Sequence, residues 1–110
     1  MSHQHKELAQ GRWGRLSFLE QMANIGSEIE RALHWKAKHD DVHCQRAFER
    51  SLELFDLTLD GLTGFARLKE LARMREAVVG YFLGTDQPMC TEASLRKYFS
   101  HFIFAARRNR

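Results

Sequence analysis

Proline, cysteine and long apolar runs are scarce in this chain of 110 residues. It contains one proline and 28% charged residues, a composition that excludes collagen-like repeats and extended disorder. No uncharged run approaches the roughly 18 residues that a membrane span needs, and no segment resembles a signal peptide. We therefore expect a cytoplasmic protein with one domain and no contact with a membrane.

The two cysteines, Cys44 and Cys90, form neither a CxxC motif nor a metal-ligand spacing. We expect two reduced thiols, because nothing in the sequence supports a disulfide between them. The chain also lacks a Gly-rich phosphate loop and a nucleophile elbow. It therefore carries no strong catalytic signature, and we expect no cofactor.

Apolar residues are plentiful, at 44% of the chain, and include eight Phe. Seventeen Lys and Arg against fourteen Asp and Glu give a net charge of +3. The apolar content is enough for a hydrophobic core. The net charge is too small to identify a nucleic-acid-binding protein.

The apolar residues recur at helical spacing in four segments, and no segment alternates with the period of a strand. The first segment begins near Ser17, which forms an S-x-x-E capping box with Glu20, and ends near Lys38. Gly26 lies on its apolar stripe and costs roughly 1 kcal/mol relative to Ala. We interpret Gly26 as a point where a neighbouring helix approaches closely.

The second segment is capped by Asp40 or Asp41 and places Phe55 on its inner stripe and Glu53 on its outer face. The third runs from about Phe65 to Leu83, and the inward residues that we predict for it are Leu68, Leu71, Ala72, Val78, Val79 and Phe82. Gly84 is a plausible C-terminal cap for this helix. The fourth is capped by Thr91 and carries an apolar stripe of Leu95, Phe99, Phe102 and Ala106.

This pattern predicts an all-α fold. It consists of a flexible N-terminal arm over residues 1–14 and a single antiparallel four-helix bundle (up-down-up-down) over residues 15–110. The aromatic residues are more numerous than one small core needs, so we expect part of the apolar surface to lie between the subunits of a homodimer. These residues are Phe18, Trp35, Phe48, Phe55, Phe65, Phe82, Phe99 and Phe102.

Four stretches resemble a family of small all-helical prokaryotic proteins that has no assigned activity. They are SFLEQMANIGSEIERA (residues 17–32), QRAFER (45–50), RLKELARMRE (67–76) and the ending from Ser94 through Arg107. The resemblance covers the chain from about residue 12 to its end. It implies a cytoplasmic microbial protein and no particular chemistry.

A broader resemblance is to HEPN-type helical bundles, whose hallmark is an Arg followed four to six residues later by a His. Arg96 and His101 match this spacing, and Lys97 stands where the family usually has a small polar residue. The resemblance implies a dimeric, metal-independent ribonuclease in which Arg96 binds the RNA phosphate and His101 moves the 2′-hydroxyl proton. Five residues of helix separate side chains by about 140°, so the two would meet on a phosphate only in a groove at a dimer axis.

The C-terminal segment is the most basic part of the chain. Residues 91–110 contain Arg96, Lys97, Arg107, Arg108 and Arg110 against the single acid Glu92. Such a segment either binds nucleic-acid phosphates or is a solvated helix end that is favoured by the helix dipole. We favour the solvated end, since no known motif accompanies the charge.

Histidines raise the question of a metal site. His39 and His43 lie four residues apart, as do Glu30 and His34, and Asp40 lies three residues before His43. A di-iron bundle needs two Glu-x-x-His motifs and two further Glu, which this chain does not have. We therefore interpret the His39/His43 pair as a solvated capping cluster and predict no metal.

Arg75 occupies a position on the inner stripe of the third helix where an apolar residue is expected. It either anchors an acidic ligand or pairs with a carboxylate of a facing helix, such as Glu28 or Glu49. We favour the pair, because an unpaired buried charge is too costly to persist.

Together these features favour a small non-enzymatic protein that forms homo-oligomers and acts through protein contacts. The alternative is a HEPN-like metal-independent ribonuclease, or a nucleic-acid-binding component of a toxin–antitoxin or defence system. A metal-binding or ligand-binding bundle is the third hypothesis.

Overall fold

The computed structural model describes residues 11–84 and 90–108, which form helices joined by short connections. Four long helices follow one another: α2 (Phe18–Ala37), α3 (Asp41–Gly61), α4 (Phe65–Leu83) and α5 (Glu92–Arg108). A short helical turn at residues 11–13 precedes them. These two ranges contain no strand, so the predicted all-α class is confirmed. Within them, no helix has the length and apolar character that crossing a membrane requires.

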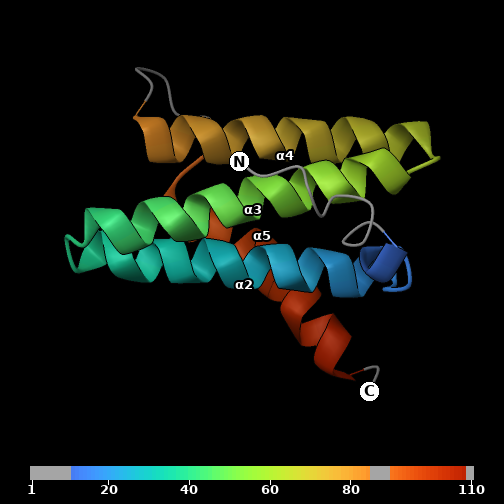
Figure 1. The fold of residues 1–110 in the computed structure, drawn as a ribbon, viewed down its shortest axis with the longest axis horizontal. Coiled ribbons are helices and arrows are strands. Elements are labelled where there is room, and N and C mark those ends of the chain that lie inside the picture. Colours follow the sequence, from blue (N-terminus) through green and yellow to red (C-terminus); the bar gives the residue numbers. More distant parts are fainter. Residues whose placement is uncertain (1–10, 85–89, 109–110) are drawn as a thin grey trace.

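Three of the helices lie side by side, with α3 between α2 and α4 (Figure 1). The chain reverses direction from α2 to α3 and again from α3 to α4. The last helix, α5, crosses behind this layer at an oblique angle, and its C-terminal end emerges past α2 in this view. The closest backbone packing joins α2 to α3 and to α5, whereas α4 lies at the edge of the layer against α3.

The helix ends follow local sequence signals. The hydroxyl of Ser17 accepts a hydrogen bond from the Glu20 backbone N–H, and the Glu20 carboxylate accepts one from the Ser17 N–H, which completes the predicted capping box. Asp40 caps α3 by accepting from the His43 N–H at 3.0 Å. Gly84 ends α4 with a φ of 67°, a left-handed conformation in which glycine avoids the strain of a side chain.

The core lies where α2, α3 and α5 meet, and α4 contributes Leu71 and Val78 to it. Phe55 is fully buried, as predicted, and its ring meets the Phe99 ring edge to face at 6.2 Å. The other largest buried apolar side chains are Met22, Ile25, Ile29, Leu33, Leu71, Val78 and Leu95. The burial of these side chains removes apolar surface from water and is the main force that holds the helices together.

The inward face predicted for α4 is partly wrong. Leu71 and Val78 are buried, and Val79 and Phe82 are half-buried and pack against the core, but Leu68 is 38% exposed and Ala72 is also exposed. Leu68 and Ala72 lie about 60° and 100° around the helix from Leu71, beyond Arg75, which lies about 40° from Leu71 and pairs with Asp56 of α3. Because α4 lies at the edge of the layer, Leu68 and Ala72 remain in water.

Trp13, in the last part of the predicted arm, contacts the helices. Its indole N–H donates a hydrogen bond to the Thr58 hydroxyl of α3 at 2.9 Å. The Gln21 side chain of α2 donates to the backbone carbonyl of Trp13 at 3.0 Å. These bonds attach residue 13 to both α2 and α3, while residues 1–10 of the arm lie outside the described residues.

Candidate functional site

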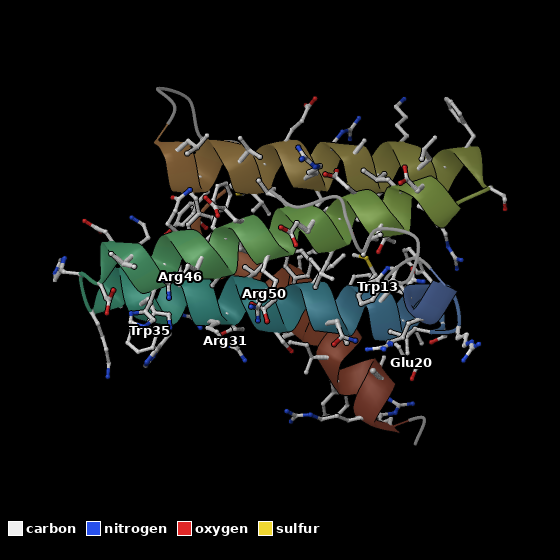
Figure 2. All side chains as sticks on the ribbon, viewed as in Figure 1. Trp13, Glu20, Arg31, Trp35, Arg46 and Arg50 are labelled. Atoms are coloured by element: carbon white, nitrogen blue, oxygen red, sulfur yellow. The ribbon has the colours of Figure 1, made fainter. Side chains whose placement is uncertain are left out.

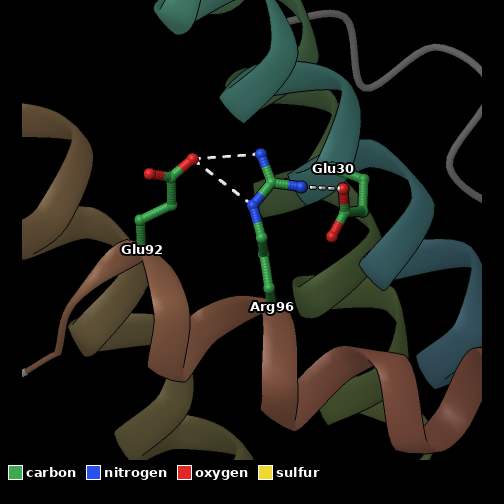
Figure 3. Close-up of polar contacts among 3 residues, drawn as sticks. All are labelled: Glu30, Glu92 and Arg96. Atoms are coloured by element: carbon green, nitrogen blue, oxygen red, sulfur yellow. Dashed lines mark hydrogen bonds and ion pairs between the residues drawn. The ribbon is translucent and has the colours of Figure 1, made fainter.

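Arg96, the predicted phosphate-binding residue, is engaged by two carboxylates (Figure 3). On α5 its guanidinium donates to Glu92 one turn earlier, with the closer nitrogen at 3.0 Å. It also donates to Glu30 of α2, which links the two crossing helices. The hydrogen bond to Glu92 is the main cause that raises the pKa of Arg96 above its ordinary value, and the charge of Glu30 adds to it. A phosphate would therefore have to compete with two acids that already hold this side chain.

His101, the predicted proton carrier, lies on a different part of α5. It is exposed, and five residues of helix separate its side-chain direction from that of Arg96 by about 140°. The structure therefore brings Arg96 together with Glu30 and Glu92 but does not bring it together with His101.

The exposed side of α5 carries a row of basic and aromatic side chains. Lys97, His101, Phe104 and Arg108 follow at intervals of four, three and four residues, which places them on one helix face. All four are exposed, and the Arg108 guanidinium lies 6.0 Å from the centre of the Phe104 ring. We call these four residues the basic face of α5. Arg107 is exposed beside it, and Arg110 lies outside the described residues.

Arg75 pairs with a carboxylate, but with a different one from those predicted. Its Nε donates to Asp56 Oδ1 of α3 at 2.9 Å, and a second nitrogen donates to Oδ2 at 3.3 Å. Glu28 instead binds Arg31 on its own helix at 3.0 Å. The Arg75 pair joins α4 to α3 and gives the arginine a structural role.

The two histidines predicted as a capping cluster have separate surroundings. The Nδ1 atom of His43 lies 2.8 Å from Asp40 Oδ2, and the His43 ring stacks on Trp35 with ring centres 4.6 Å apart. His39 occupies the turn with a φ of 58°. Within residues 11–84 and 90–108, no three His, Cys, Asp or Glu side chains gather as metal ligands would.

Neither cysteine has the surroundings of a reactive thiol. Cys44 and Cys90 are both free and half-buried. Burial raises the pKa of each thiol, which disfavours the nucleophilic thiolate.

A group of arginines on α2 and α3 is the first surface that sequence reasoning missed. Figure 2 shows Arg31 and Trp35 of α2 on the same face of the molecule as Arg46 and Arg50 of α3. The four-residue spacing of Arg46 and Arg50 is visible in the sequence, but their position beside α2 depends on how the helices pack. Arg31 is bound by Glu28, so this face offers fewer uncompensated charges than its arginines suggest.

The second missed surface is the outward side of α4. Phe65 is 78% exposed and Leu83 is 62% exposed, at opposite ends of the helix. Between them lie Leu68 and Ala72, which are exposed, and Val79, which is half-buried. At 100° per residue, these five side chains fall within about 60° of arc. We call them the outer stripe of α4.

Comparison of the chain with known proteins gives no match to a family model, a curated protein or a solved structure. The functional argument therefore rests on the surfaces of the molecule itself.

Proposed function

We propose that this chain is a non-enzymatic cytoplasmic protein that forms homo-oligomers and acts through protein contacts. In this proposal the chain is an antiparallel up-down-up-down four-helix bundle. The alternating directions of α2, α3 and α4 support this arrangement, whereas α5 crosses these helices obliquely. The outer stripe of α4 is the observation that carries the proposal. Exposed apolar side chains on one face of a helix, here Phe65, Leu68 and Leu83, are typical of a protein–protein interface.

The exposure of Phe65 and Leu83 supports an interface role for this stripe over a core role. Side chains of this size gain roughly 1.5–3 kcal/mol each when they are fully buried, yet these two remain mostly in water in the single chain. Scattered exposed apolar residues need no explanation, whereas four on one face of one helix do. Association would remove this surface from water.

The association is tested by sedimentation velocity of the purified chain at several concentrations. We expect a species of twice the mass of one chain. Leu83→Ser and Phe65→Ser should each shift the association equilibrium toward the monomer, with unchanged helical content. Val42→Ser is the matched control, because Val42 is 61% exposed but lies on α3 and not on the helix that carries the outer stripe. A wild-type chain that stays monomeric at all concentrations would contradict the proposal.

A second candidate is a nucleic-acid-binding component that resembles HEPN-type proteins. The basic face of α5 favours it, because Lys97 and Arg108 can contact phosphates while the exposed Phe104 ring can stack on a base. Binding of a labelled single-stranded RNA, followed by fluorescence anisotropy, tests this candidate. Lys97→Ala and Arg108→Ala should each weaken the binding and reduce its dependence on salt.

A further inference from the structure

We propose that two copies of this chain pair through antiparallel α4 helices, with a two-fold axis beside residues 73 and 74. This inference rests on the proposed function and names both the partner and its orientation. It is carried by the apolar and charged residues of α4 taken together.

Four of the five residues of the outer stripe are distributed evenly about the middle of α4, and the position symmetric to the fifth, Ala72, is occupied by Arg75, which is paired with Asp56. Phe65 begins the helix and Leu83 ends it, and Leu68 and Val79 lie further inward on either side of residues 73 and 74. In an antiparallel pair, Leu68 therefore faces Val79 of the second copy, and Phe65 approaches the end that carries Leu83. A self-complementary surface of this kind is what a two-fold dimer requires.

Two exposed charges of opposite sign border the stripe on one side. Lys69 and Glu76 are seven residues apart, so they point within about 20° of each other. Neither takes part in an ion pair in the described residues. Their charges are therefore available for a partner at the edge of the stripe.

The two-fold axis brings these charges together. Rotation about the middle of α4 places Lys69 of each copy within about 3 Å, along the helix axis, of Glu76 of the other. In heptad terms both residues occupy the same flanking position, and such positions face each other in antiparallel helix pairs. The dimer thus gains two symmetric ion pairs at the border of its apolar seam.

A parallel pair would not use these charges. Its flanking positions face the opposite border of the partner helix, where Gly64 and the buried Leu71 lie. The pair Lys69 and Glu76 therefore favours the antiparallel orientation over the parallel one. The charges also favour a second copy over an unrelated partner, because the surface is complementary to itself.

The interface is small, so the two ion pairs should have a measurable effect on the dissociation constant. A helix of 19 residues is about 28 Å long, so a single helix pair lies at the low end of protein–protein interfaces. We expect a dissociation constant that sedimentation equilibrium can follow in the micromolar range.

Charge reversal tests the pairing. Lys69→Glu and Glu76→Lys should each raise the dimer dissociation constant about tenfold, because each replaces two attractions with two repulsions. The double variant Lys69→Glu/Glu76→Lys should return it to within about threefold of the wild type. Arg73→Glu is the control, since Arg73 is exposed on α4 but lies about 100° away from the stripe.

The possible outcomes separate this inference from the proposed function. If neither single reversal changed the dissociation constant of the dimer, or if the double variant failed to restore it, the antiparallel pairing would be overturned. The proposal of a homo-oligomer would still stand. A wild-type monomer would overturn both. Circular dichroism melts of the variants verify that folding is unchanged, because both residues are exposed.

Discussion

Gly26 of α2 and Phe99 of α5 mark the point where these two helices cross. A Cβ placed on Gly26 would lie 2.9 Å from the Cβ of Phe99 and 3.3 Å from Cδ1 of Ile103. The Phe99 Cβ is attached directly to the backbone, so it cannot move aside by a change of rotamer. The absence of a side chain at residue 26 therefore sets how closely α5 approaches α2.

We expect Gly26→Ala to destabilise the protein by about 1–3 kcal/mol, because the added methyl group forces α5 away from α2. This loss opposes the roughly 1 kcal/mol that Ala gains over Gly in a helix. Gly61→Ala is the control: a Cβ there meets nothing within 4 Å, so this variant should be neutral or slightly stabilising. Urea denaturation measures both, and equal midpoints would mean that the crossing is not tight at residue 26.

Phe55→Ala should cost about 3–5 kcal/mol, because it leaves a cavity beside the Phe99 ring in the centre of the core. Glu53→Ala changes an exposed residue two positions away on the same helix and should alter the free energy of unfolding by less than about 0.5 kcal/mol. Chemical denaturation of the two variants provides the comparison. If both variants lost a similar free energy of unfolding, our assignment of the face of α3 that enters the core would be wrong.

Local features of this fold could be predicted from the sequence because they depend on residues a few positions apart. The Ser17–Glu20 capping box and the left-handed Gly84 each involve one turn of helix. Gly26 was also predictable, since a glycine within an apolar stripe implies a neighbour that approaches closely.

The outward side of α4 could not be predicted in the same way. Leu68 and Leu71 are three residues apart, and helical spacing alone assigns both to one face. Which of them is buried depends on how α4 rests on α3. The same holds for Arg75, because its pairing with Asp56 requires the register between two helices.

Tyr98 should make the protein sensitive to alkaline pH. Burial, and then its hydrogen bond to Glu70 of α4 at 2.9 Å, raise its pKa above the ordinary value of 10.0. The pKa of Tyr98 is higher in the folded state than in the unfolded state. The contribution of protonated Tyr98 to the free energy of unfolding is therefore fully present below about pH 10 and is lost as the pH rises above it.

Tyr98→Phe removes this titration, so its stability should fall less steeply than that of the wild type between about pH 10 and 11.5. Urea midpoints across this range measure the difference, and all other titrating groups are common to both proteins. Parallel pH profiles for the two would show that Tyr98 titrates alike in the folded and unfolded chains.

The last prediction concerns catalysis by Arg96 and His101. We expect the purified wild-type protein not to cleave RNA, because Arg96 is held by Glu30 and Glu92 and points about 140° away from His101 on α5. Arg96→Ala should instead lower the free energy of unfolding by up to about 1 kcal/mol, as expected for the loss of partly exposed ion pairs between α2 and α5. His101→Ala should leave stability nearly unchanged, since the imidazole is exposed. Incubation with end-labelled RNA and thermal denaturation measure the two effects separately. RNA cleavage by the wild type that disappears in both His101→Ala and Arg96→Ala, with folding intact, would establish the ribonuclease alternative instead.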